Sequence, residues 1–290
     1  METIKSSKYT HRYIARFIIE AETPMAIGSG EKSIETDAMV VRDVNGLPYL
    51  PGTTIAGVIR SMLHIGDKND LWGYQSAQSG HGSEIAFTEG RIFNSQGIVI
   101  DGMQHGAFED PLLKYYDILP IRQHVCITKH GVAAAHGKFD EQVVFAGTRF
   151  CFEMEVASDG TNWNEVEEII SATRKCTFRI GSGSRSGFGK IKVISVSVVD
   201  INLKEQADLY LTKSSNLQDS AKWMGWNIVT IKDKENNTLN DAQYVIYRLT
   251  LRPRDFIFFG SGLQDEDGNA DMTTVKAKRV IWTNGVGEMT

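Results

Sequence analysis

The sequence predicts an α+β fold, because strand-like and helix-like patterns follow one another along the first part of the chain. Two segments, Tyr13–Ala21 and Gly147–Val156, alternate apolar with other side chains and are rich in β-branched and aromatic residues, as half-buried strands are. Two others, Thr53–Leu63 and Asn164–Lys175, carry apolar residues at helical spacing. The glycine-rich segment Phe178–Lys192 separates the second helix from a further predicted strand.

The first predicted strand leads into a polar loop that ends at an acid. Gly28–Thr36 has too few apolar residues to pack as a strand or a helix, and Asp37 follows it directly, before an apolar run. A turn at Pro48–Gly52 precedes the first helix, where Thr53 stands at the expected N-cap. Because the N-terminus of a helix presents free N–H groups and a positive dipole end, this region is suited to hold an anion beside the carboxylate of Asp37.

Two strand pairs are expected between the helices. Ile85–Phe93 and Ile98–Ile100 flank turn-forming residues and predict the first pair. Ile121–Thr128 and Phe139–Phe145 predict the second, with the small-residue excursion Lys129–Gly137 between them. Since this excursion has too few large side chains to form its own core, we interpret the second pair as a hairpin that projects and contacts a partner, with a plain surface hairpin as the alternative.

The glycine-rich loop matches neither of two familiar phosphate-binding motifs. A Walker loop requires a glycine six residues before Lys190 and a hydroxyl after it, but Ser184 and Ile191 stand there. A dinucleotide loop joins a strand to a helix, whereas this loop joins a helix to a strand. The remaining hypothesis is a nest of backbone N–H groups, with Arg185 and Lys190, that binds several phosphates of one chain. A ligand-free glycine-rich turn is the alternative.

The charge of the 290-residue chain is distributed unevenly. Its formal net charge of −5 disfavours a generic nucleic-acid binder, yet residues 174–192 contain six basic side chains and no acid. Residues 118–139 also lack acids and hold three Lys or Arg and three His. Such segregation predicts a groove that binds a polyanion, although two solvated loops would have the same composition.

Several other classes of protein are disfavoured. The N-terminus lacks an apolar signal segment, and no stretch approaches the roughly 18 consecutive apolar residues of a membrane-spanning helix, so we expect a cytoplasmic protein without a membrane partner. Cys126, Cys151 and Cys176 form no Cys-x-x-Cys pair, which argues against a zinc site or a disulfide framework. We expect these thiols to be buried.

Three motifs, in this order, carry a resemblance to a known family. They are LPYLPGTTIAGVIR (Leu47–Arg60), the hairpin region Ile121–Phe150, and GSGSRSGFGK (Gly181–Lys190). Together they resemble the turn and helix, the thumb and the glycine-rich loop of the RAMP superfamily of CRISPR-associated proteins. The resemblance is strongest to the repeated backbone subunit of type III effector complexes.

This resemblance implies a ferredoxin-like (RRM-like) βαββαβ palm with a projecting β-hairpin thumb, and partners that include a guide crRNA, a target RNA and other RAMP subunits. It implies that Asp37 cleaves the target RNA with a bound Mg²⁺ or Mn²⁺, to which Asp37 is the protein ligand. The RNA contacts implied are Gly52, Thr53 and Arg60 in the first helix, Arg122, His124, Lys129 and His136 in the hairpin, and Gly181, Gly183, Arg185, Gly187, Gly189 and Lys190 in the loop.

The chemistry of RNA cleavage agrees with a single carboxylate. RNA carries its own nucleophile, the 2′-OH, and Mg²⁺ accepts one protein carboxylate together with phosphate oxygens and waters. Two alternatives stay open: a scaffold subunit that binds guide RNA without cleaving, and a metal-independent guide-processing ribonuclease that uses His64, His124 or His136 as a general base. The sequence departs from the family pattern at Ala26, where a His is often found, and at Thr53–Ala56, which lacks the usual lysine.

The tail of the chain repeats its head. Arg16–Met39 aligns with Arg248–Met272, so that the strand, the Gly-Ser-Gly and the acid all recur, and Asp271 is a second candidate for the catalytic acid. We therefore expect a palm-and-thumb domain at residues 1–203, a linker or insertion at 204–241, and an incomplete second RAMP unit at 242–290.

Overall fold

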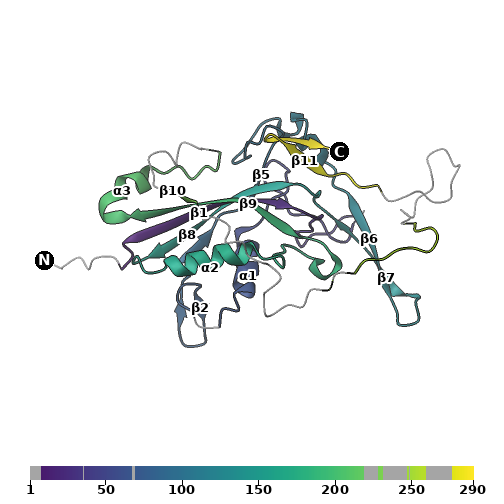
Figure 1. The fold of residues 1–290 in the computed structure, drawn as a ribbon, viewed down its shortest axis with the longest axis horizontal. Coiled ribbons are helices and arrows are strands. Elements are labelled where there is room, and N and C mark those ends of the chain that lie inside the picture. The colour runs from purple at the N-terminus through teal and green to yellow at the C-terminus, as the bar shows by residue number, and fades with distance from the viewer. Residues whose placement is uncertain are drawn as a thin grey trace.

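The computed structural model describes residues 8–34, 36–66, 69–218, 228–230, 247, 249–258 and 276–290. Its centre is a six-stranded antiparallel sheet in the order β10-β9-β1-β8-β4, with β5 also paired to β8 (Figure 1). The strands of this sheet and its two covering helices are β1 (His11–Ala21), α1 (Gly52–Met62), β4 (Ile85–Phe87), β5 (Arg91–Ile92), β8 (Arg149–Ser158), α2 (Trp163–Thr173), β9 (Ile191–Asn202) and β10 (Ile228–Thr230).

The remaining elements lie around this sheet. Three two-stranded hairpins are β2 (Tyr74–Gln75) with β3 (Gly80–His81), β6 (Ile121–Ile127) with β7 (Ala133–Gln142), and β11 (Val280–Thr283) with β12 (Val286–Met289). The helices are α3 (Leu203–Thr212) and the short 3₁₀ turns η1 (Ala107–Glu109), η2 (Leu113–Tyr116) and η3 (Ser184–Ser186). The α+β class expected from the sequence is confirmed.

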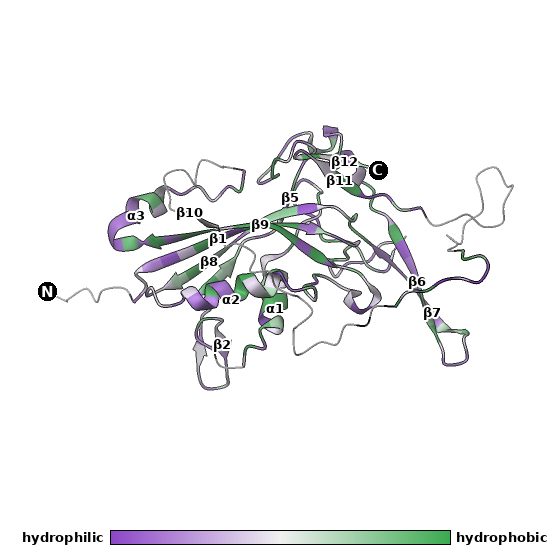
Figure 2. Cartoon of the chain, viewed as in Figure 1, coloured by the Kyte–Doolittle hydropathy of each residue, from purple (hydrophilic) through white to green (hydrophobic). Residues whose placement is uncertain are grey.

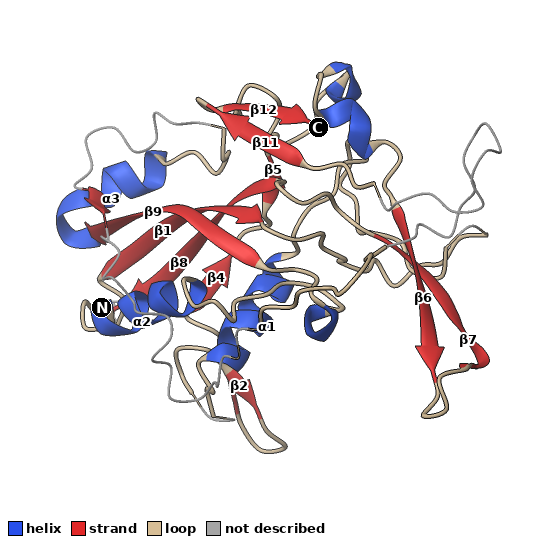
Figure 3. Ribbon diagram, turned by 45° about the vertical axis from the view of Figure 1, so that its right-hand side comes forward, coloured by secondary structure: helices blue, strands red, loops and turns tan. Residues whose placement is uncertain are grey.

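One face of the sheet and the helices α1 and α2 enclose the main core. On β1 the side chains that face the helices are buried, and Phe17 stacks on its cross-strand partner Phe152 with ring centroids 4.8 Å apart. The helices bury Ile55 and Ile59 from α1 and Val166 from α2 in the same cluster. Figure 3 shows both helices on the same side of the sheet.

The opposite face of the sheet alternates ion pairs with apolar residues. Glu153 of β8 is almost fully buried, with Oε1 3.1 Å from Arg16 Nε and Oε2 3.1 Å from Lys213 Nζ. Helix α3 packs here, where Tyr210 contacts the buried cluster of Ile14, Val199 and Ile201. The segment expected as a linker thus begins with a helix attached to the sheet.

The C-terminal hairpin β11–β12 packs on the first domain. The amide of Val280 donates to the Ala146 carbonyl at 2.8 Å, and the Val280 side chain belongs to the main core. Trp282 Nε1 donates to the Gly147 carbonyl at 2.7 Å, and the Arg149 guanidinium lies 4.5 Å from the centroid of the indole. Residues 279–290 are therefore part of the first domain's packing, which the repeat in the sequence did not indicate.

The described part of the second copy is exposed where the first copy is buried. Leu249 and Leu251, which align with the fully buried Phe17 and Ile19, are 81 % and 84 % exposed and lie outside any strand. The strand expected to recur at the start of the second copy is therefore absent from residues 249–251, and Asp271 lies outside the described residues.

Several local predictions are wrong, each for a local reason. Helix α1 begins at Gly52 with Pro51 at its N-cap, two positions before the expected N-cap Thr53, and no side chain caps it. The excursion in the projecting hairpin is shorter than predicted, because β7 already begins at Ala133. The segment 98–100 forms only an isolated bridge, and Cys126 and Cys176 are exposed, whereas Cys151 is buried. Within the described ranges, no helix has the length and apolar character needed to cross a membrane.

Candidate functional site

The loop that carries Asp37 is joined to the root of the projecting hairpin β6–β7, which is the end of the hairpin where residues 140–142 lie. Ala38 forms a parallel bridge with Glu141, and the Gln142 amide donates to the Ala38 carbonyl at 2.9 Å. Asp37 and Asp140 exchange two contacts: the Asp37 amide donates to the Asp140 carbonyl at 3.1 Å, and the Asp140 amide donates to Asp37 Oδ2 at 3.2 Å. The loop thus pairs with the edge of β7. This pairing holds the exposed carboxylate of Asp37 at the root of the hairpin.

The glycine-rich loop reaches the same root through Glu141. This acid is only 8 % exposed; its Oε2 accepts a hydrogen bond from Ser182 Oγ at 3.1 Å, and its Oε1 lies 2.9 Å from His124 Nε2. The His124 ring stacks on Phe139 at 4.9 Å and meets the edge of Phe188 at 5.8 Å. One buried carboxylate therefore connects β6, β7 and the loop, so three of the regions selected from the sequence converge here.

Two glycines are required by the way in which this loop packs. Gly181 and Gly189 have φ of +96° and +68°, and an added Cβ would lie 2.3 Å from the Ala26 carbonyl oxygen and 2.1 Å from that of Ile180. By contrast, Gly187 has open space around its Cα, and residues 184–187, including Arg185, are exposed. The exposed turn is the part of the loop that is accessible to a ligand.

The open nest of N–H groups predicted for this loop is largely occupied by the protein itself. The Ser182 and Gly189 amides donate to the carbonyls of Ala26 and Pro24, both at 2.8 Å, and the Lys190 amide donates to Thr23 Oγ1 at 2.9 Å. The Lys190 ammonium lies 2.6 Å from Glu22 Oε2. These amides hold the loop against the loop that follows β1 and are not available to phosphates.

The remaining candidates lie at different distances from this root. Arg122 is half-buried on β6, whereas Lys129 and His136 are exposed further along the hairpin, which mixes hydrophobic and hydrophilic residues (Figure 2). Arg60 is directed elsewhere, since its Nη1 donates to the carbonyls of Trp72 and Gly73 at 3.3 and 3.2 Å.

The start of α1 packs on the end of β4. A Cβ on Gly52 would lie 2.4 Å from the Phe87 carbonyl oxygen, so the glycine permits a close contact between backbone segments. Thr53, the next residue, is exposed. Gly52, the first residue of the helix, therefore serves packing.

Reasoning from the sequence missed Glu141 and Asp140. Both stand in the stretch FDEQVVF, which the alternation identified only as a strand. Asp140 Oδ1 is buried and has no hydrogen-bond partner among the described residues. Unpaired buried carboxylate oxygens are costly, which makes this atom, next to Asp37 in the strand pairing, a natural acceptor for a cation or a water.

The acids at this root fit a divalent cation that is shared with a substrate. In the described parts of the chain, no three His, Cys, Asp or Glu side chains form a cluster able to hold a metal by themselves. Mg²⁺ is often bound through one or two carboxylates plus waters and phosphate oxygens. The exposed Asp37 and the unpaired Asp140 oxygen are suited to that kind of coordination.

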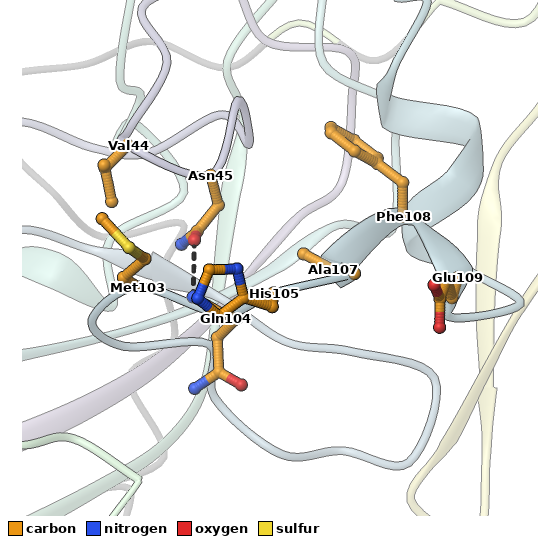
Figure 4. A pocket seen from close by; sticks show the side chains of 9 residues that line it. Val44, Asn45, Met103, Gln104, His105, Ala107, Phe108 and Glu109 are labelled. Carbon is orange, nitrogen blue, oxygen red and sulfur yellow. Dashed lines mark hydrogen bonds between the residues drawn. The ribbon is translucent and has the colours of Figure 1, made fainter.

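A separate hollow of about 480 Å³ lies beside the turn that follows residue 43. It is bordered by Val44, Asn45 and residues 103–109, and the Asn45 side-chain oxygen accepts a hydrogen bond from the Gln104 amide at 2.8 Å (Figure 4). None of the residues selected from the sequence lines it.

Comparison with known families identifies the chain. A family model described as the RAMP superfamily matches residues 18–192, which include the end of β1, both covering helices, the projecting hairpin and the glycine-rich loop. The chain belongs to the RAMP superfamily. It is thus a RAMP-family CRISPR-associated protein, and this membership indicates a role in binding RNA. No curated protein matched the chain in a sequence search.

Proposed function

We propose that this RAMP protein is a guide-RNA-binding backbone subunit of a type III CRISPR effector complex, and that it cleaves complementary target RNA with Asp37 and a divalent metal. The observation that carries the proposal is the convergence of the Asp37 loop, the hairpin β6–β7 and the glycine-rich loop at one root. An RNA strand that crosses this root meets an exposed carboxylate beside the base of a projecting hairpin.

The topology supports the palm-and-thumb interpretation. The order β1, α1, β4, β8, α2, β9 along the chain, with β9-β1-β8-β4 across the sheet, supports a ferredoxin-like βαββαβ fold. In this interpretation the hairpin β6–β7 is the thumb, inserted between the second and third strands of the palm. The face of the sheet opposite the helices is covered by α3 and β11–β12, so RNA binds at the thumb end of the palm.

The catalytic role rests on how Asp37 is held. Its backbone is paired to β7, and Oδ2 accepts the Asp140 N–H, so the carboxylate has a defined direction relative to the hairpin. A bound Mg²⁺ or Mn²⁺ would be held by Asp37, with Asp140 next to it, and would stabilise charge on the scissile phosphate. The 2′-OH of the RNA then needs only to be aligned with that phosphate, which the thumb and loop do by fixing the strand.

The test is cleavage of a guide-complementary RNA by the assembled complex with Mg²⁺. Asp37→Ala is expected to slow cleavage by about 100-fold or more while guide binding persists, and Asp271→Ala, the acid of the partial second copy, is compared in parallel. Glu31→Ala is the matched control, because Glu31 is an exposed acid of the same loop. Unchanged cut sites in Asp37→Ala would refute cleavage by Asp37, and unchanged cut sites in both Asp37→Ala and Asp271→Ala would make the chain a non-cleaving scaffold.

Chelation of the metal distinguishes the proposed metal-dependent cleavage from the metal-independent alternative. EDTA should abolish cutting, whereas continued cutting in EDTA would favour a guide-processing ribonuclease with a histidine base. His124 is a poor candidate for such a base, because its Nε2 faces Glu141 and its ring contacts Phe139 and Phe188. The exposed His136 and His64 are the positions to substitute in that case.

A further inference from the structure

We propose that a second RNA-binding pocket, which takes one nucleotide of a single strand, lies between the root of the hairpin and residues 276–278 near the C-terminus. It rests on the proposed function in so far as the chain binds RNA, and it is independent of catalysis by Asp37. The pocket has a volume of about 310 Å³, at the lower end of the range of small-molecule sites. Its lining includes an apolar floor of Val143, Val144 and Phe145 and the cationic side chains of Arg122, Lys276 and Lys278.

The floor of the pocket is apolar and built into the core. Val143, Val144 and Phe145 are each at most 5 % exposed, and the Val143 amide donates to the Pro120 carbonyl at 2.9 Å, which fixes the floor to the start of β6. Ile118 stands at the rim with 84 % of its surface exposed. An apolar surface of this size is suited to the face of a nucleobase, because bases stack on apolar and aromatic side chains with little regard to sequence.

The charges around this floor have one sign. Among the described residues, Arg122, Lys276 and Lys278 line the pocket and no acid does. The Lys278 ammonium also lies 5.0 Å from the centroid of the Tyr115 ring, a cation–π contact that ties residue 278 to the first domain. Three cations beside an apolar floor match a nucleotide, whose phosphate is anionic and whose base has a flat face that stacks on apolar surface.

The pocket and the Asp37 site lie close together along the chain. Val144 in the pocket floor stands four positions after Asp140, which pairs with Asp37, and just beyond the end of β7, a span of about 13 Å in extended chain. One RNA strand that passes the hairpin root can therefore contact both. An acidic segment of a neighbouring protein would pair with the cationic side chains but would bury less of the apolar floor. We therefore assign the pocket to RNA.

The assignment is tested by RNA binding to the full chain. Fluorescence anisotropy with a labelled oligouridylate compares wild type with Lys278→Glu, with Lys204→Glu as the control, an exposed lysine on α3 far along the sheet. Lys278→Glu should weaken binding by about 10-fold at low salt and reduce the slope of log K against log salt by about 0.7. Lys204→Glu should change neither. Equal RNA affinity and equal salt dependence in the two variants would contradict the assignment of this pocket to RNA.

Ultraviolet crosslinking of oligouridylate to the wild-type chain adds a readout that needs no variant. Crosslinked peptides from residues 118–122, 143–145 or 276–278 are expected, and their absence beside crosslinks elsewhere would contradict the proposal. If Lys278→Glu blocks association with other subunits but leaves RNA affinity unchanged, the pocket holds a protein and the assignment is wrong. If Asp37→Ala leaves cleavage intact while Lys278→Glu lowers affinity, the catalytic proposal fails and the pocket stands.

Discussion

Replacing Gly147 by alanine should detach the C-terminal hairpin from the domain. Gly147 has φ of +83°, and an added Cβ would lie 1.9 Å from the Val280 carbonyl oxygen. The overlapping atom is a backbone oxygen of β11, so no side-chain rotation relieves the overlap. Strand β11 therefore has to move away.

The magnitude follows from the contacts that leave with β11. Burial of Val280 contributes about 1.5–3 kcal/mol, the bond from Trp282 to the Gly147 carbonyl about 1 kcal/mol, and the stacking of Arg149 on Trp282 about 0.5–1 kcal/mol. The conformational entropy that the released segment gains offsets part of this sum. We therefore expect the free energy of unfolding to fall by about 2–4 kcal/mol beyond the cost of the left-handed backbone.

The control for that backbone cost is Gly131→Ala. Gly131 has φ of +78° and nothing within 4 Å of an added Cβ, so its substitution should cost only about 1–2 kcal/mol. Guanidinium unfolding of both variants measures the difference, and limited proteolysis of the C-terminus reports whether β11–β12 is released. Equal losses of stability in the two variants, with the C-terminus still protected, would refute the reasoning.

Three further predictions concern the site and the core. Gly181→Ala should reduce RNA binding and loosen the glycine-rich loop, whereas Gly187→Ala, with φ of +95° but open space, should have a smaller effect on hydrogen exchange in the loop. Glu141→Gln should lower the stability by about 1–3 kcal/mol in denaturant unfolding, since it weakens the contacts of a buried acid; an unchanged midpoint would contradict this. Burial raises the pKa of Tyr116, against a smaller lowering by the Thr148 hydrogen bond. Its contribution to stability should therefore be complete below about pH 10 and fall as the pH rises further, a slope that Tyr116→Phe should remove.

Much of the palm could be predicted because its signals are local. The alternation in Tyr13–Ala21 and the helical spacing in Asn164–Lys175 record which side chains face the core, and β1 and α2 lie there within two residues. The first helix was also predicted, but its cap was not, because Pro51 rather than Thr53 precedes its first residue.

The candidate site was predicted only in parts. Asp37 was selected as a lone acid, yet nothing in its neighbourhood indicates that its carboxylate meets the amide of Asp140, more than a hundred positions away. Glu141 carries no signal at all in the sequence, because its role depends on Ser182 and His124, which reach it from two other segments. The repeat likewise predicted a second unit in the tail, while the last residues pack on the first.

The α+β class, the order of the elements, the projecting hairpin and the region of the catalytic candidate could all be inferred without a structure. Periodicity, glycine and turn chemistry are properties of neighbouring residues, so they can be read along the chain. The folded chain was needed to see which polar atoms meet at the hairpin root, which loop amides are already hydrogen-bonded, and where residues 276–290 lie. These depend on contacts between distant segments, whose pairing is set by the packing of the whole core and not by any local pattern.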